Sequence, residues 1–290
     1  MLGVVVPQMS HQVNSEVIAG VEEATADAGR FCVFTVSRND PCRELDQLAE
    51  LVDDERIGGV ILAGGFQLTA EYARRFVRVT REARDAGKPI VLCGRAMTAS
   101  RELVVTGVTV LEYDNEGGAA SAVGLLASRG HRRIALVRGP LGHSTSDARS
   151  VGWSQGLDRF GLEPDPDLVR TGPRDASHGR AAGADLLSRH PDVTAIFAES
   201  DELAMGVLQA AHLAGRPVPS SLSVIGFDDQ HNASYFVPPL TTVHMPFAEL
   251  GRRAARIALD LDPVHPGQDR LMVGTHLTIR ESVSEPPRRP

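Results

Sequence analysis

The sequence predicts an α/β protein built from two similar lobes, each a doubly wound parallel sheet. Three observations support this fold class. Short apolar runs of strand length alternate with amphipathic segments of helix length along most of the chain. The alternation starts afresh near Arg133, about half-way along. The chain has 290 residues, more than one typical domain needs.

Strand and helix alternate from the first residues onward. The first strand is predicted over 2–6 and is stopped by Pro7. A helix follows over about 14–28, with Val17 and Val21 on one face. Because strands linked through helices pair in parallel, this region predicts a sheet with helices on both faces. The further elements expected in this half are strands over 31–36, 59–63 and 89–93 and helices over 43–55 and 69–85.

One further strand and helix are predicted before the alternation starts afresh near Arg133. A strand over 108–112 is followed by a helix that runs to about residue 128, with Gly130 as its expected C-cap. The later elements expected are strands over 134–137, 168–170, 195–198, 222–227 and 270–279, and helices over 147–160, 178–188 and 248–261 and one that begins near 202.

Composition and charge exclude several classes of protein. The net charge of −7 gives this chain no general attraction for nucleic acid. Its three cysteines, Cys32, Cys42 and Cys93, are odd in number and lack zinc-type spacing, which favours a reducing compartment. The apolar start over 1–6 is too short for a signal peptide, and no run reaches membrane-spanning length. We therefore expect a cytoplasmic protein with no membrane partner.

Catalytic and metal-binding signatures are missing from the sequence. It has no G-x-S-x-G elbow and no phosphate-binding loop of the G-x-x-x-x-G-K type, and Pro7-Gln8-Met9 follows the first strand where a dinucleotide fingerprint would stand. The ten histidines are scattered singly. We therefore expect no enzyme activity, no cofactor and no metal site.

Two predicted strands end in acidic residues. The strand over 195–198 leads to Ser200 and Asp201, and the strand over 222–227 leads to Asp228 and Asp229. Ligands of open parallel sheets bind at the carboxyl ends of the strands, so these side chains are candidates for ligand binding. Asp201 is equally explained as a helix cap and Asp229 as a loop residue, and these alternatives stay open.

Arg149 is the candidate cation. It stands near the start of the predicted helix over 147–160, where the helix dipole disfavours a positive charge unless an anion meets it. The anion is either Asp228 or a neighbouring acid, in a structural salt bridge, or a group on a ligand that the guanidinium binds as a forked donor.

Further candidates come from the first lobe. Ser10, Gln12 and Asn14 follow the first strand and offer neutral hydrogen-bonding groups. Phe66 follows the third strand and Phe247 follows the region of the Thr241 strand, and each offers an apolar wall. An ordinary loop or packing role explains these residues as well as a binding role does.

The region over 197–251 resembles the core of the LacI/GalR family of bacterial transcriptional regulators. The matching motifs are Phe197-Ala198-Glu199-Ser200-Asp201, Ser223-Val224-Ile225-Gly226-Phe227-Asp228-Asp229 and Pro238-Pro239-Leu240-Thr241-Thr242-Val243. The resemblance implies a periplasmic-binding-protein-like type I fold that binds a small polar effector, typically a sugar, in a cleft between the lobes. It also favours an effector contact for Arg149.

The resemblance carries expectations about lobes and partners. Family chains cross three times between lobes, which places residues 1–111 and 246–268 in the N-terminal lobe and residues 112–245 and 269–290 in the C-terminal lobe. Family members are homodimers that bind operator DNA through a helix-turn-helix headpiece before the first strand, whereas here Met1-Leu2 enters that strand directly. Operator binding is therefore expected only through such a headpiece.

Two departures from the family leave the ligand class open. Sugar-binding members often carry an aromatic residue in the first loop and another after the strand over 168–170, but residues 11–14 and 172–175 contain none. Ser200 also stands where many members have Asn. The alternative function is a periplasmic-type sugar-binding protein of a transporter, which the short apolar start and the segment over 238–242 argue against.

Overall fold

The structure of the protein, a computed structural model, describes residues 1–9, 12–65, 69–95, 107–262, 264 and 269–287. It divides into two compact units. Unit 1 comprises Met1–Tyr113 and Pro246–Gly274, and unit 2 comprises Asp114–Met245 and Thr275–Pro290. Each unit is an α/β fold with its own parallel sheet, as the sequence predicts.

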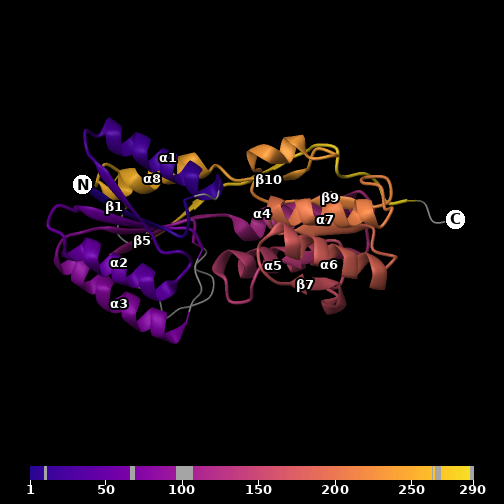
Figure 1. Ribbon diagram of the computed structural model, residues 1–290, viewed down its shortest axis with the longest axis horizontal. Helices are drawn as coiled ribbons and strands as arrows, with labels where there is room; N and C mark the ends of the chain where they lie inside the picture. Colours follow the sequence, from indigo (N-terminus) through magenta and orange to yellow (C-terminus); the bar gives the residue numbers. More distant parts are fainter. Residues whose placement is uncertain (10–11, 66–68, 96–106, 263, 265–268, 288–290) are drawn as a thin grey trace. The chain divides into compact units, whose positions relative to one another are not determined.

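Unit 1 is built on a six-stranded parallel sheet of strand order β11-β5-β4-β3-β1-β2. Helices α1 and α8 cover one face and α2 and α3 the other (Figure 1). Every residue of β1, β3 and β4 is buried, which explains why these strands read as continuous apolar runs. The strands are β1 (Leu2–Val6), β2 (Cys32–Val36), β3 (Gly59–Ala63), β4 (Ile90–Cys93), β5 (Val108–Tyr113) and β11 (Arg270–Val273), and the helices are α1 (Gln12–Asp27), α2 (Pro41–Asp53), α3 (Ala70–Asp85) and α8 (Phe247–Ala258).

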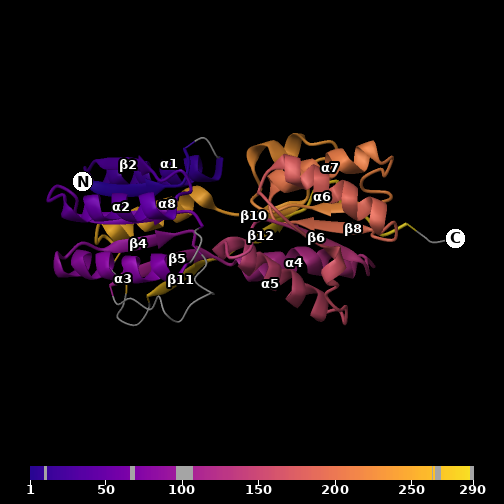
Figure 2. The same ribbon diagram turned by 60° about the horizontal axis from the view of Figure 1, so that its bottom comes forward.

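Unit 2 has a four-stranded parallel sheet of order β7-β6-β8-β9. Helices α4 and α5 lie on one face and α6 and α7 on the other (Figure 2). A separate antiparallel pair joins β10 to β12. The strands are β6 (Ile134–Arg138), β7 (Val169–Thr171), β8 (Ala195–Ala198), β9 (Ser223–Ile225), β10 (Thr242–His244) and β12 (His276–Thr278), the helices are α4 (Asn115–Ser128), α5 (Ser144–Asp158), α6 (Ala176–Arg189) and α7 (Asp201–Leu213), and two 3₁₀ turns are η2 (Pro166–Leu168) and η3 (His231–Tyr235).

The strand predicted over 270–279 is two strands. β11 pairs with β5 in unit 1, whereas β12 pairs with β10 in unit 2. The last residue pair of the β5–β11 ladder is Val273 with Tyr113. The two chain segments that follow these strands therefore leave unit 1 at the same level of the sheet. Residues 269–274 therefore lie in unit 1, and the boundary after Tyr113 falls two residues beyond the expected one, because the β5–β11 pairing holds these residues there.

Three helix pairs pack closely: α1 with α8, α4 with α5, and α6 with α7. Glycines stand where the backbones approach. A Cβ at Gly20 of α1 would lie 1.9 Å from the carbonyl oxygen of Ala248, and one at Gly251 of α8 would lie 2.1 Å from that of Val17. Only a residue without a side chain permits this approach. Among the described helices, none is long and apolar enough to cross a membrane.

Gly20→Ala is expected to destabilise unit 1 by roughly 1–3 kcal/mol, because the added methyl group meets the α8 backbone rather than a movable side chain. The matched control is Gly124→Ala in α4, where the new Cβ meets only Phe160 at 3.6 Å. That change should be neutral or stabilising, since alanine is the better helix former. Scanning calorimetry compares the two, and equal melting temperatures would contradict the close approach.

Candidate functional site

Arg149 lies in the second turn of α5, with its side chain 4% exposed. Its guanidinium pairs with Asp228, with 3.0 Å between Nη2 and Oδ1. Nη1 donates to the carbonyl oxygen of Glu199 at 2.5 Å, and Nε donates to Oδ1 of Asn115 at 2.9 Å. The ring of Phe227 lies 3.9 Å from the guanidinium carbon, in cation–π geometry. Arg149 therefore meets the anion that its position predicts, and this anion is Asp228.

Burial lowers the pKa of Arg149 below its usual value, and the charge of Asp228 offsets only part of this effect. The pair thus lies in a buried environment that disfavours the ionised form of each group. The remaining N–H groups of the guanidinium and the second oxygen of Asp228 give the pair donors and acceptors beyond its internal contacts.

Asp228 and Asp229 have unusual backbone conformations. Their φ angles are 108° and 54°, in a region that side-chain-bearing residues rarely adopt. The amide of Asp228 donates to the carbonyl oxygen of Val243 at 2.9 Å, which holds the turn against β10. Strain of this kind persists only where surrounding contacts enforce it, and it is typical of ligand-binding positions.

Asp201 is the first residue of α7 and is fully buried. Its Oδ1 accepts from the hydroxyl of Thr242 at 2.6 Å, and its Oδ2 accepts from the amide of Gln230 at 2.7 Å. Burial, followed by the charge of Asp228, raises its pKa well above the usual value. With both oxygens occupied by the protein, Asp201 positions the Asp228 turn. The helix cap is Ser200, whose Oγ accepts from the amide of Leu203 at 3.2 Å.

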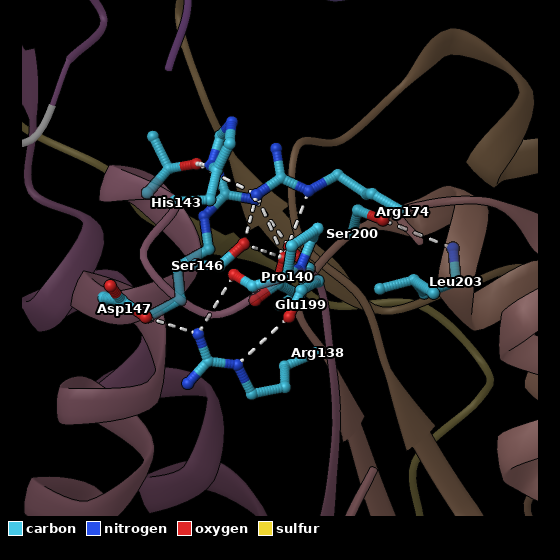
Figure 3. A network of polar contacts seen from close by, with 12 residues as sticks. Arg138, Pro140, His143, Ser146, Asp147, Arg174, Glu199, Ser200 and Leu203 are labelled. Carbon is cyan, nitrogen blue, oxygen red and sulfur yellow. Dashed lines mark hydrogen bonds and ion pairs between the residues drawn. The ribbon is translucent and has the colours of Figure 1, made fainter. Parts of the chain in front are cut away.

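Glu199 and Arg174 form a second charged pair beside the first (Figure 3). Glu199 is fully buried, and its Oε1 accepts from Nε of Arg174 at 3.1 Å and from the hydroxyl of Ser146 at 2.7 Å. Burial opposes ionisation of Glu199, but the charges of Arg174 and Arg149 outweigh it, so its pKa lies below the usual value. Neither residue was predicted as a site residue, although both follow strands at their carboxyl ends, as Asp228 does.

The candidates from the first lobe lie in unit 1. Gln12 contacts Glu16, and Nδ2 of Asn14 donates to the carbonyl oxygen of Gln8 at 2.8 Å. Phe247 is buried, with its ring 5.4 Å from that of Tyr113 in edge-on contact. Each of these contacts has a structural role inside unit 1. Ser10 and Phe66 lie outside the described residues.

Asp229 anchors the antiparallel pair of strands. Its Oδ1 accepts from Nη2 of Arg280 at 2.7 Å, and its Oδ2 contacts Nδ1 of His244 at 2.9 Å and the hydroxyl of Thr278 at 3.0 Å. Burial opposes the ionisation of Asp229, but the hydrogen bonds from Arg280 and His244 outweigh it and lower its pKa. Asp229 is therefore a structural anchor of β10 and β12 rather than a plain loop residue.

Comparisons with known proteins agree with this architecture. The model of the periplasmic binding protein-like domain family matches residues 123–283. The HTH-type transcriptional regulator CelR of Thermobifida fusca is 32% identical over 272 residues, covering 92% of this chain and 74% of CelR. The HTH-type transcriptional repressor CytR of Escherichia coli K12 is 31% identical over 283 residues, covering 96% of this chain and 78% of CytR.

The chain belongs to the LacI family of transcriptional regulators. It carries the effector-binding core of that family, and its role is regulatory rather than enzymatic. A solved complex of the regulator CelR with cellobiose superposes with a TM-score of 0.83 at 30% identity, covering 97% of this chain and 84% of that one. A LacI family regulator from Mycobacterium smegmatis superposes with a TM-score of 0.77 at 26% identity, covering 99% and 100%.

The acid sensitivity of this LacI-family core should depend on Asp229. Its folded pKa is lower than its unfolded value of about 3.9, so its ionised form stabilises the fold above that pH, and the contribution is lost as pH falls through the folded pKa. Asp229→Asn should therefore cost roughly 1.5–3 kcal/mol at pH 7 and progressively less below about pH 4.

Melting temperatures between pH 7 and pH 3 measure this difference. Asn tolerates the left-handed backbone of position 229, so the substitution tests the charge rather than the turn. The exposed Asp27 provides the control, and Asp27→Asn should follow the wild-type profile. A gap between Asp229→Asn and wild type that stays constant down to pH 3 would contradict the role of the carboxylate.

Proposed function

We propose that this LacI-family core binds a saccharide at the Arg149–Asp228 pair and that binding alters the DNA affinity of the regulator to which the core belongs. The observation that carries the proposal is the buried ion pair at the carboxyl end of the unit 2 sheet. Among the described residues, no hydrogen bond occupies Oδ2 of Asp228 or the second N–H of Nη1 and of Nη2. The carbonyl of Glu199 and the side chain of Asn115 hold the guanidinium in place.

The chemistry of the pair suits a polyol. Neighbouring hydroxyl groups of a sugar each donate one hydrogen bond and accept others, so a carboxylate beside a guanidinium satisfies both functions. Hydrogen bonds to charged groups are stronger than neutral ones. Because Asn115, Glu199 and Phe227 already orient Arg149, ligand binding loses little conformational entropy from the arginine side chain.

The relatives favour a carbohydrate as the ligand class. CelR was solved as a complex with cellobiose, and this chain aligns with that protein over 97% of its own length. Cellobiose is therefore the first probe. The core is proposed to work as other effector domains do, by binding the effector with different affinity in two arrangements of the regulator, since only a differential affinity shifts an equilibrium.

Asp228→Asn is expected to weaken saccharide binding by about 10- to 150-fold, the equivalent of losing a hydrogen bond worth roughly 1.5–3 kcal/mol. Asn is the suitable replacement because it tolerates a positive φ. Calorimetric titration with cellobiose and a panel of mono- and disaccharides measures the effect. Arg149→Lys should act in the same direction, since lysine keeps the charge but loses the fork.

The control removes a pair elsewhere in unit 2. Arg170 on β7 pairs with Asp185 of α6 at 2.6 Å. Asp185→Asn should leave saccharide affinity unchanged. If Asp228→Asn lowers the melting temperature while the folded protein keeps full affinity, the pair is purely structural and the proposal fails.

We also propose that the core is a homodimer. Leu213, Tyr235 and Val237 of unit 2 are 73%, 72% and 93% exposed, and we assign these apolar side chains to the dimer interface. Sedimentation velocity should give twice the chain mass of 31.0 kDa.

The substitution Leu213→Glu should weaken the dimer, because it places a charge at the end of α7 in an apolar contact. Val151→Glu changes an exposed apolar residue of α5 and serves as the control. A monomer at all concentrations of the wild-type chain would contradict the dimer, and equal effects of the two substitutions would contradict the assignment of Leu213 to its interface.

A further inference from the structure

Arg174 lies shortly after β7 and is held along one edge. Its Nε donates to Glu199, and its Nη2 donates to the hydroxyls of Ser146 and Thr145 at 2.8 and 2.9 Å. Within the described part of the chain, Nη1 of Arg174 makes no hydrogen bond, and the side chain is 25% exposed. Figure 3 shows this nitrogen pointing away from the network. The guanidinium is thus fixed in orientation with one pair of N–H groups open.

Glu199 connects Arg174 to the proposed ligand pair. Its carboxylate binds Arg174, and its backbone carbonyl accepts from Nη1 of Arg149. One residue at the end of β8 therefore positions both arginines. On the proposed function, a ligand held by Arg149 and Asp228 is within reach of Arg174, because Glu199 contacts both arginines.

The surroundings of this open edge favour an anion. Helix α5 begins at Ser144, beside the Arg174 contacts at Thr145 and Ser146, and the first turn of a helix carries partial positive charge. The charges near it are matched in pairs, Arg174 with Glu199, Arg149 with Asp228 and Arg138 with Asp147, so this partial charge is the further feature that an anion would meet. A ligand hydroxyl would accept one hydrogen bond from Nη1. A ligand carboxylate would accept the same hydrogen bond and would also interact favourably with the partial positive charge at the start of α5.

We propose that Arg174 is a specificity-determining residue that makes the protein prefer saccharides bearing a carboxylate, such as uronic or aldonic acids, over their neutral counterparts. This inference rests on the proposed binding of a saccharide at the Arg149–Asp228 pair. Residues 172–175, which follow β7, contain no aromatic ring on which the apolar face of a neutral sugar would stack. Charge recognition by Arg174 takes the place of stacking there.

The test compares matched pairs of ligands by calorimetric titration: cellobiose with cellobionate, and glucose with glucuronate. At low ionic strength the acid of at least one pair should bind roughly tenfold more tightly, because charge-assisted hydrogen bonds are about twice as strong as neutral ones. The preference should shrink as salt is added, while the affinity of the neutral sugar stays constant.

Two sets of substitutions assign the preference to Arg174. Replacing Arg174 alone would leave the buried Glu199 carboxylate without its partner, so the double variant Arg174→Gln/Glu199→Gln removes both charges and keeps side chains of similar shape. It should lose the acid preference, so that each acid and its neutral counterpart bind with similar affinity. The control Arg170→Gln/Asp185→Asn removes the pair between β7 and α6 and should keep the preference.

Each outcome decides the inference. Neutral sugars that bind as tightly as the acids, or an acid preference that survives in the Arg174→Gln/Glu199→Gln variant, would overturn the role of Arg174 and leave the proposed function standing. If no saccharide binds, neutral or acidic, the proposed function itself fails. Melting temperatures establish that each variant is folded before it is titrated.

Discussion

The buried ion pair between Arg149 and Asp228 is the interaction on which the rest of unit 2 depends. Removing two charges from water costs on the order of several kcal/mol each, and their attraction offsets this only when further hydrogen bonds complete the geometry. Asn115, the carbonyl of Glu199 and the ring of Phe227 supply those contacts from α4, β8 and the end of β9. The pair therefore forms only when several elements are correctly packed.

The constraint extends from this pair to the segments that link the two units. Asp228 sits in a left-handed turn that Asp201 and β10 hold in place. The next residue, Asp229, binds His244 of β10 and Thr278 of β12. The chain passes between units just after β10 and just before β12. One peptide bond thus separates the proposed ligand contact from the anchor of both strands.

Much of this arrangement could be predicted from the sequence, because it follows from rules that act locally. Strand-length apolar runs predicted the two parallel sheets. The rule that ligands bind at the carboxyl ends of parallel strands made Asp228 a candidate, and the helix dipole indicated that Arg149 needs an anion nearby. The division of 270–279 was not predicted, since both halves have strand-like sequences and only the pairing partners differ. Arg95 and Glu44 form another fully buried pair, 2.6 Å apart, that spans 51 positions and follows from no sequence pattern.

The proposed role of Arg174 shows why the ligand class is harder to predict than the fold. In the sequence it is one arginine in a loop without aromatic residues, and the absence of a stacking platform says only what the site lacks. Its chemistry depends on Glu199, which is 25 positions away and holds the Nε–Nη2 edge, while Nη1 makes no hydrogen bond to any described residue. A stacked aromatic ring adds roughly 0.5–1.5 kcal/mol and tolerates many sugars, whereas a hydrogen bond to a charged group contributes roughly 1.5–3 kcal/mol and requires a matching acceptor. An aromatic ring would therefore favour sugar rings in general. A fixed guanidinium in its place favours ligands that carry one particular functional group.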